Sequence, residues 1–304
     1  RGPAVEAFES PDDAYPDART AAEAMRRLRD LSAKPDQPFF LAVGFLKPHL
    51  PFVAPKRFWD LYDREKIAVP ENYARPPKDA PAGAVHQSGE LRVYAGIPPT
   101  GALDEETARE LIHGYYACVS FVDAQIGKLL DELERLNLAR NTIVVLWGDH
   151  GWQLGDHGMW NKHSCFETSM HAPLWVAAPM RTDVAPGTRV AALTEFIDIY
   201  PSLCELAGLP IPEHVQGTSF LPQMRDPARP GKPYAVGRFG PGDTIRSNDA
   251  RFTQYSTVAG EVTGTMLYDH RTDPRENVNR AAERPDEAKR LQDALRRIAL
   301  PPDR

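Results

Sequence analysis

The stretch NTIVVLWGDHGWQLGDHGMWNK, residues 141–162, joins an apolar run to a group of acids, histidines and a lysine. The run at residues 141–149 has the length and the composition of a buried strand in an α/β sheet. In open α/β sheets, ligands bind beyond the carboxyl ends of the strands. The sequence therefore predicts that Asp149 and His150 lie at a ligand-binding edge, and that Gly151 lets the chain turn there.

A carboxylate beside an imidazole suits a divalent cation. The Asp149 carboxylate is a hard oxygen ligand, which favours Ca²⁺ or Mg²⁺, whereas the His150 imidazole is more usual with Zn²⁺ or Mn²⁺. This pair leaves the identity of the metal open, and two ligands are too few for a complete site. Because a single Asp-His-Gly after a strand is more often only a turn, the metal hypothesis depends on the residues around it.

A second apolar run, PFFLAVGF at residues 38–45, predicts another strand, buried on both faces. Lys47 and His49 follow it between prolines that restrict the backbone, and Lys162 follows the apolar run at 141–149 in a similar way. An ammonium group offers three donors to the oxygens of a tetrahedral anion such as sulfate or phosphate. Each residue alone is more often an ordinary loop or surface residue, but together they make an anion-binding site a reasonable hypothesis.

Aromatic and histidine side chains accompany the same stretch. Trp152 and His157 are candidate substrate-binding residues, with core packing and ordinary polar contacts as the alternatives. Trp160 and His163 are more typical of packing and of polar contacts, and His171 is a candidate for supporting a ligand residue.

The rest of the chain predicts helices alternating with strands before residue 220, and antiparallel strands with a closing helix beyond it. Apolar residues recur at three- and four-residue steps along residues 105–136, which predicts a long helix capped by Asp104. Shorter helices are expected at residues 22–33, 195–207 and 283–299, and a further strand at residues 173–179. The predicted fold class is α/β, with a central mixed, mostly parallel sheet between helices in residues 1–220 and a small α+β subdomain in residues 221–304.

The composition disfavours several classes of protein. The net charge is −6, with 36 Lys and Arg against 42 Asp and Glu, which argues against nucleic acid as the main partner. The three cysteines form no Cys-x-x-Cys pair, so neither a disulfide framework nor a cysteine zinc site is expected. No apolar run approaches the ~20 residues that span a bilayer. Because the first residues contain neither an initiator Met nor a signal-type apolar run, we expect a part of a longer protein.

Several blocks of the sequence resemble the sulfatase family of the alkaline-phosphatase-like superfamily, and especially its iduronate-2-sulfatase subgroup. The blocks are PFFLAVGFLKPHLPFVAPKRFWDLY, YYACVSFVDAQIGKLLDELERLNLARNTIVVLWGDHGWQLGDHGMWNKHSCFE, HAPLWVAAP, TEFIDIYPSLCELAGLPIPEHVQGTSFLP and LYDHRTDPRENVN. They extend over most of the chain, from about residue 15 to about residue 280, and are far more specific than any single tripeptide.

The resemblance implies a role for each candidate residue. Asp149 and His150 match Ca²⁺ ligands, with Mg²⁺ or Mn²⁺ as alternatives, and many other sulfatases have Asn in place of His150. His49 and Lys162 match catalytic residues that contact the sulfate group or the oxygen of the leaving alcohol. The remaining candidates, for substrate binding, are Lys47, Trp152 and His157.

Two family features are missing from this chain. Sulfatases carry the motif Cys-x-Pro/Ala-Ser/Pro-Arg, whose cysteine is converted to the formylglycine nucleophile, and an N-terminal Asp-Asp pair that binds the metal. The three cysteines here, Cys118, Cys165 and Cys204, lie in other contexts, and the Asp-Asp pair is also missing. The resemblance therefore implies that an N-terminal segment of the same protein is a partner and supplies the nucleophile. It also implies export to the periplasm, the cell exterior or a lysosome-like compartment.

The resemblance thus predicts a sulfuric ester hydrolase that removes sulfate from a sulfated carbohydrate, and the subgroup indicates a 2-O-sulfated uronic acid. Two alternatives stay open. A phosphonate or phosphate ester hydrolase of the same fold would act faster on phosphonate esters than on sulfate esters. A non-catalytic protein would bind sulfated sugars through the same cationic residues without turnover.

Overall fold

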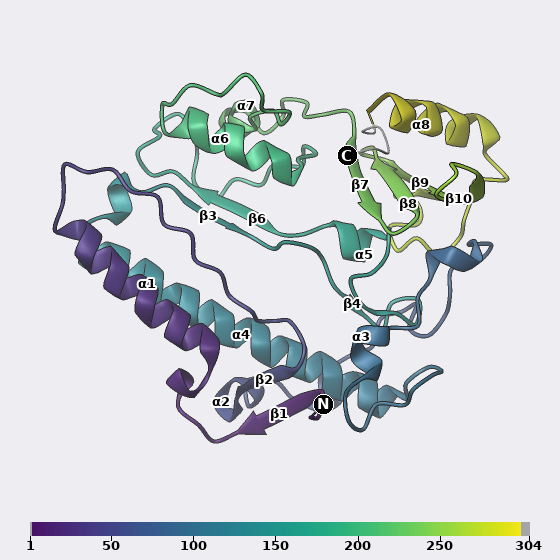
Figure 1. The fold of residues 1–304 in the computed structure, drawn as a ribbon, viewed down its shortest axis with the longest axis horizontal. Helices are drawn as coiled ribbons and strands as arrows, with labels where there is room; N and C mark the ends of the chain where they lie inside the picture. The colour runs from purple at the N-terminus through teal and green to yellow at the C-terminus, as the bar shows by residue number, and fades with distance from the viewer. Residues whose placement is uncertain (1, 299–304) are drawn as a thin grey trace. The chain divides into compact units, whose positions relative to one another are not determined.

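The computed structural model describes residues 2–298, which fall into two compact units. The first unit contains the chain up to residue 73 together with residues 87–142, and the second contains residues 74–86 and the chain from residue 143 (Figure 1). This division differs from the predicted boundary at residue 220. Both units combine helices with strands, in agreement with the predicted α/β class.

Two helices, α1 (Pro16–Ser32) and α4 (Glu105–Arg135), dominate the first unit and lie along one another (Figure 1). α4 confirms the predicted long helix. The Asp104 carboxylate caps it by accepting a hydrogen bond from the Thr107 N–H at 2.8 Å. α1 begins earlier than predicted because Pro16 suits the first turn of a helix, where no N–H partner is needed.

A parallel pair of strands, β1 (Val5–Phe8) and β2 (Phe52–Pro55), packs against α4. The contact is close at Gly114 of the helix, where a Cβ would lie 2.8 Å from Phe52 Cβ and 2.8 Å from Trp59 Cη2. Glycine at this position therefore lets the helix approach the strand directly. This unit also contains two short α-helices, α2 (Lys56–Trp59) and α3 (Gly89–Arg92).

The strand predicted at residues 38–45 is wrong. This segment is neither helix nor strand, its exposure alternates from residue to residue, and Phe40 is 83% exposed. An apolar run predicts burial, but a strand also needs a neighbouring strand to pair with. Within residues 2–298 this run has no such neighbour.

The second unit contains two of the predicted strands. β3 (Val144–Trp147) and β6 (Leu174–Ala177) confirm the strands expected at 141–149 and 173–179, and they pair antiparallel. A small hairpin follows β3, formed by β4 (Gln153–Leu154) and β5 (Trp160–Asn161). The sequence predicts a central sheet with mostly parallel strands. Within the described residues, β1 and β2 are the one pair of strands that run parallel, and the other strand pairs are antiparallel.

The end of the chain forms a four-stranded antiparallel sheet with a closing helix, as expected from the sequence. The strand order is β10-β9-β8-β7, and the helix α8 (Pro285–Ile298) packs on one face of the sheet around Leu291 and Phe252. The other face packs on the loop before α5, through Met159 and Phe166. The strands of this sheet are β7 (Ala235–Phe239), β8 (Gly242–Arg246), β9 (Ala250–Ser256) and β10 (Val262–Asp269). The unit also contains the helices α5 (Glu167–Met170), α6 (Ile199–Leu206) and α7 (Leu221–Arg225). Of these, α6 confirms the helix expected at 195–207.

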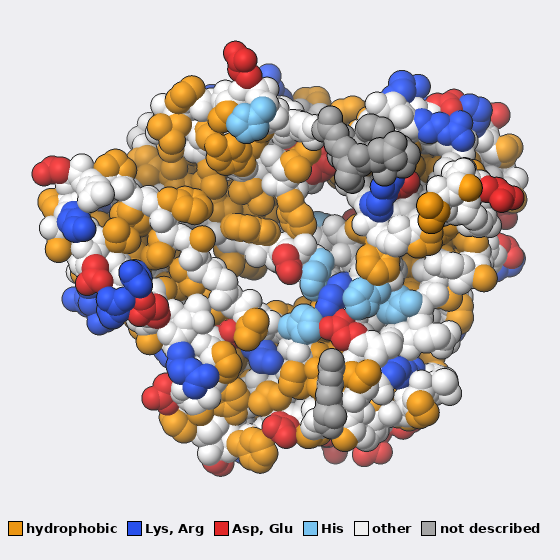
Figure 2. Space-filling view, viewed as in Figure 1, with side chains coloured by type: hydrophobic (Ala, Val, Ile, Leu, Met, Phe, Trp, Pro, Cys, Tyr) orange, Lys and Arg blue, Asp and Glu red, His pale blue; other side chains and the backbone are white. Residues whose placement is uncertain are grey.

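Large hydrophobic side chains are exposed around β3, β6 and α6, where Figure 2 shows them gathered on one face. Trp147 of β3 is 47% exposed and Trp175 of β6 is 65% exposed. A two-stranded pair is only marginally stable without further covering. Among residues 2–298, no helix combines the length and the apolar character needed to cross a bilayer.

Candidate functional site

The residues after β3 form a tight turn that carries Asp149 and His150. The turn is fixed by two backbone hydrogen bonds, from Gly148 N–H to Pro173 O at 3.1 Å and from Gly151 N–H to Ser169 O at 2.9 Å. Gly151 is required by a close approach, because a Cβ there would lie 2.1 Å from the Thr168 carbonyl oxygen. The turn therefore presents Asp149 and His150 at the end of β3, as predicted.

The geometry of this pair fits a shared cation. His150 Nδ1 lies 2.7 Å from the Gly151 carbonyl oxygen, which can only accept, so in the neutral tautomer that this bond favours Nδ1 carries the hydrogen and Nε2 has the lone pair. Nε2 lies 3.6 Å from Asp149 Oδ1. One imidazole nitrogen and one carboxylate oxygen at this spacing can contact the same ion at usual metal–ligand distances of roughly 2.0–2.6 Å. The Asp149 carboxylate is largely exposed, which leaves room for further ligands.

Trp152 connects this pair to Lys162. Its ring stacks on the His150 imidazole, with centroids 5.8 Å apart and planes 27° from parallel. The Lys162 ammonium nitrogen lies 5.0 Å from the centroid of the Trp152 ring, a cation–π distance. The β4–β5 hairpin makes this possible because it pairs Gln153 with Asn161 and thus returns the chain beside its start. The structure therefore brings together Asp149, His150, Trp152 and Lys162.

His157 has a different environment from the one predicted. Its ring is buried, with Nδ1 3.2 Å from the Arg75 carbonyl oxygen and Nε2 3.0 Å from the Arg275 carbonyl oxygen. Both ring nitrogens thus face backbone carbonyls, and the ring packs 5.0 Å from that of Phe166. These contacts make His157 an anchor of the loop, and we correct its predicted role from substrate binding to support.

His49 lies in the first unit, in the turn after the irregular segment 38–45. Its Nδ1 lies 2.8 Å from the Leu50 carbonyl oxygen, and its Nε2 lies 2.8 Å from the Glu90 carboxylate at the start of α3. The ring remains 41% exposed, so a ligand can reach it. Asp17 holds the preceding turn by accepting hydrogen bonds from the Leu46 and Lys47 amides at 2.8 and 2.9 Å.

Lys47 supports this turn from within. Its ammonium group donates hydrogen bonds to the carbonyl oxygens of Pro51 at 2.6 Å and His49 at 3.2 Å. Burial lowers the pKa of Lys47, and these carbonyls satisfy two of its three donors. Lys47 therefore stabilises the loop that carries His49, and its predicted role changes from substrate binding to support of this loop.

The three cysteines are all free and buried. Burial raises the pKa of Cys118 to about 12 and that of Cys165 to about 11, so both are neutral thiols near neutral pH. Since the thiolate is the reactive form, neither is placed to act as a nucleophile.

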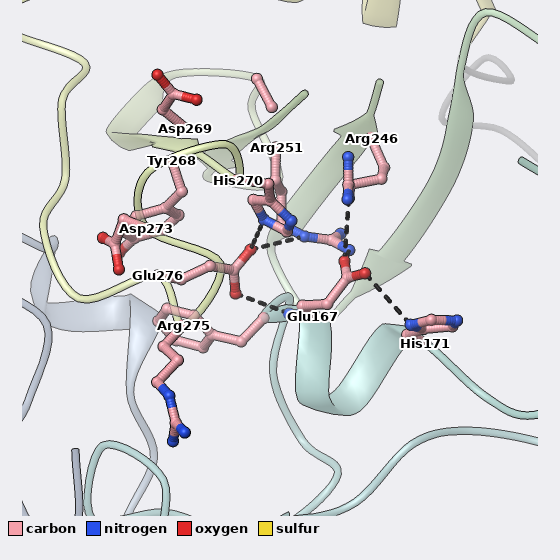
Figure 3. A network of polar contacts seen from close by, with 12 residues as sticks. Glu167, His171, Arg246, Arg251, Tyr268, Asp269, His270, Asp273, Arg275 and Glu276 are labelled. Atoms are coloured by element: carbon pink, nitrogen blue, oxygen red, sulfur yellow. Dashed lines mark hydrogen bonds and ion pairs between the residues drawn. The ribbon is translucent and has the colours of Figure 1, made fainter. Parts of the chain in front are cut away.

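Sequence reasoning missed a buried network of charged residues (Figure 3). Glu276 Oε1 lies 3.0 Å from Arg251 Nε and 2.9 Å from His270 Nε2. Glu167 also pairs with Arg251, and with Arg246 at 3.2 Å. Glu276 lies in the block LYDHRTDPRENVN, but nothing in that block indicates which distant residues it contacts.

Glu167, His270 and Glu276 are also close enough together to be considered as metal ligands. Arg251 argues against this, because its guanidinium group already pairs with both carboxylates. Burial disfavours its charge, but the two carboxylates outweigh burial and raise the pKa of Arg251. The cluster therefore contains its own cation, and Asp149 and His150 remain the better metal pair.

Two family models match the chain. The model described as Sulfatase matches residues 3–209, and the model described as N-sulphoglucosamine sulphohydrolase, C-terminal, matches residues 155–299. A sulfatase of Formosa agariphila is 32% identical over 277 residues, covering 90% of this chain and 52% of the relative. Iduronate 2-sulfatase of Mus musculus is 34% identical over 245 residues, covering 71% of this chain and 44% of the relative. The chain thus spans about half the length of these curated relatives.

Solved structures show the same fold. The structure of BT4656 in complex with its substrate D-glucosamine-2-N,6-O-disulfate has a TM-score of 0.77 at 20% identity, covering 93% of this chain and 69% of that chain. A phosphonate monoester hydrolase from Silicibacter pomeroyi has a TM-score of 0.76 at 25% identity, covering 91% of this chain and 59% of that chain.

Proposed function

Because the chain belongs to the sulfatase family, we propose that it provides the cationic part of a sulfuric ester hydrolase site. The observation that carries the proposal is the group around Trp152, where the metal-type pair Asp149 and His150 accompanies the Lys162 ammonium. Negative charge develops on the leaving oxygen as a sulfate ester breaks, so the reaction needs fixed positive charge around the ester.

In this proposal Asp149 and His150 hold one divalent cation, Ca²⁺ in first place and Mg²⁺ or Mn²⁺ as alternatives. The support is the lone pair of His150 Nε2 beside the exposed Asp149 carboxylate. When bound, the cation supplies Lewis-acid stabilisation of charge on sulfate oxygens. Further ligands must come from residues outside this pair.

Lys162 and His49 carry the remaining roles. Lys162 holds a sulfate oxygen through a charge-assisted hydrogen bond, and its position over Trp152 orients the ammonium group. His49 protonates the oxygen of the leaving alcohol from Nε2, the ring atom beside the Glu90 carboxylate. A general acid must be oriented before it can transfer its proton, and the Glu90 carboxylate, 2.8 Å from Nε2, fixes the orientation of the His49 ring.

The nucleophile in this proposal is a formylglycine on an N-terminal segment of the same protein. Its hydrate would attack the sulfur and take the sulfuryl group from the ester, and the alcohol would leave. Support comes from the buried, neutral thiols of this chain and from the length of the relatives, about twice the part matched here. The exposed apolar side chains of β3 and β6 offer that segment a surface to cover.

The proposed substrate is a sulfated carbohydrate, and more narrowly a 2-O-sulfated uronic acid. The narrower proposal rests on the similarity to proteins named iduronate 2-sulfatase, from mouse at 34% identity and from human at 31% identity. Export from the cytoplasm is proposed on the same resemblance alone.

A second candidate is a phosphonate monoester hydrolase, which the similarity to the Silicibacter pomeroyi enzyme favours. Both reactions use a tetrahedral anion, so the Lys162 and metal-pair geometry serves either. The experiment measures initial rates of the full-length protein on 4-nitrophenyl sulfate and on 4-nitrophenyl phenylphosphonate, before and after chelation and after Ca²⁺ is restored.

Faster turnover of the sulfate ester, lost on chelation and recovered with Ca²⁺, supports the proposed sulfatase. Faster turnover of the phosphonate ester supports the second candidate. Binding of a sulfated disaccharide with no turnover of either ester would instead identify a non-catalytic sulfated-glycan-binding protein.

A further inference from the structure

The loop that carries Lys162 is held at both of its ends by one turn of the chain, residues 270–276. At the start of the loop, His157 Nε2 lies 3.0 Å from the carbonyl oxygen of Arg275. At its end, the Glu167 N–H donates to Glu276 Oε2 at 2.7 Å. Arg275 and Glu276 are neighbours in the sequence, so both anchors belong to the same short segment.

Glu276 is unusual in three respects. It is 2% exposed, its backbone has the left-handed φ of 58°, and its carboxylate bonds to three different parts of the second unit. One oxygen accepts from the first amide of α5, and the other lies between Arg251 of β9 and His270. A buried carboxylate and a non-glycine residue with positive φ both cost free energy, so they persist only where the surroundings fix them.

Apolar side chains also pack the same loop against the four-stranded sheet. Met159 and Phe166, on either side of Lys162, contribute to a buried cluster with Tyr268 at the end of β10. Glu167, directly after Phe166, pairs with Arg251 and Arg246 on the same face (Figure 3). The ion pairs thus secure a loop that apolar packing has already brought to the sheet.

We propose that Glu276 is a positioning residue for Lys162, acting through Arg251 and the Glu167 amide. The inference rests on the proposed function in one respect, that Lys162 binds an anionic oxygen. Lys162 lies five residues before Glu167, so a loosened α5 terminus releases the ammonium from its place over Trp152. The turn that carries Asp149 and His150 keeps its bond from the Gly148 N–H to Pro173 O at 3.1 Å, which lies beyond α5, so we expect a smaller effect there than at Lys162.

The test uses inorganic sulfate as the probe, with its dissociation constant measured by calorimetry. Glu276→Gln keeps a carbonyl oxygen for the Glu167 amide but removes the charge facing Arg251. We expect it to weaken sulfate binding by about tenfold, the low end of the range seen when a supporting partner of a ligand residue is lost. Glu283→Gln is the matched control, because Glu283 is exposed and its carboxylate pairs with the exposed Arg280 at 2.7 Å; it should leave binding unchanged.

A double-mutant cycle separates positioning from general destabilisation. In the Lys162→Ala background, Glu276→Gln should change sulfate binding by less than about twofold, because the residue it positions is gone. Equal losses with and without Lys162 would overturn the proposal and indicate a purely structural role. Should Glu276→Gln not fold, His157→Gln loosens the other anchor of the loop and is expected to give the same pattern.

Hydrogen exchange makes the result independent of the proposed function. Glu276→Gln should speed amide exchange across residues 157–170 by at least about tenfold while α8 keeps its protection. Unchanged exchange in that loop overturns the proposal whatever the activity. Faster exchange in a protein whose wild type binds no sulfate supports the clamp on the loop and rejects the proposed anion site.

Discussion

Gly151→Ala is expected to destabilise the second unit strongly, and the structure gives the size of the effect. The added Cβ would lie 2.1 Å from the Thr168 carbonyl oxygen and 2.6 Å from that of His171, and both are backbone atoms that no rotamer change can remove. Reaching an ordinary contact requires the two segments to separate by about 1.3 Å. That movement breaks the bond from the Gly151 N–H to Ser169 O, which is 2.9 Å long.

The lost hydrogen bond costs about 1 kcal/mol, and overpacking adds about 1–3 kcal/mol, so the free energy of unfolding should fall by about 2–4 kcal/mol. Urea unfolding followed by circular dichroism measures this change. Gly148→Ala is the matched control three residues earlier, since its Cβ would come no nearer than 3.3 Å to the Pro173 side chain, 3.4 Å to the His150 carbonyl oxygen and 3.6 Å to the Ala172 Cβ. It should cost less than about 1 kcal/mol. Equal losses for the two variants would refute the close-approach argument.

Three further predictions concern packing, pH and binding. Leu291→Ala removes a fully buried side chain of α8 and should lower the free energy of unfolding by about 2–5 kcal/mol in urea, whereas Leu209→Ala, at a 60% exposed position, should change it by less than about 0.5 kcal/mol. The hydrogen bond with Glu167 raises the pKa of His171 against a smaller opposing effect of burial, so this pair stabilises the fold below about pH 6.5 and loses its contribution as the pH rises through the raised pKa. Because the His171 side chain is 75% exposed, His171→Gln should cost only about 0.5 kcal/mol near about pH 5.5 and almost nothing near about pH 9, and an equal cost at both values would contradict this sign. Lys162→Ala should weaken sulfate binding by roughly 10- to 100-fold, the value of a charge-assisted hydrogen bond, while Lys66→Ala, at an exposed lysine, should leave it unchanged.

Local patterns in the sequence predicted the local parts of this structure. The helical spacing and the Asp104 cap located α4, and the apolar run before Asp149 located β3 and the turn that follows it. The run at 38–45 failed because pairing with another strand cannot be read from the run itself. Composition and spacing therefore predict elements well where the cause is local.

The parts of the site that the sequence did not reveal depend on distant partners. The sequence predicts an anion-binding role for Lys47, but its ammonium group donates to the loop carbonyls of Pro51 and His49. The sequence predicts a substrate-binding role for His157, but both of its ring nitrogens face backbone carbonyls, those of Arg75 and Arg275. Glu276 contacts a residue 109 positions away, and no periodicity or short motif encodes such a contact.

The central claim is that this chain supplies the cationic groups of a sulfatase and that another segment supplies the nucleophile. It is tested most directly by sulfate release from a 2-O-sulfated uronic acid disaccharide, measured by ion chromatography. The chain alone, the chain co-expressed with the nucleophile-bearing segment, and the same pair carrying Lys162→Ala are compared. We predict release only by the complete pair, and a large loss in the Lys162→Ala form. Equal release by the chain alone, or release unaffected by Lys162→Ala, would contradict the account.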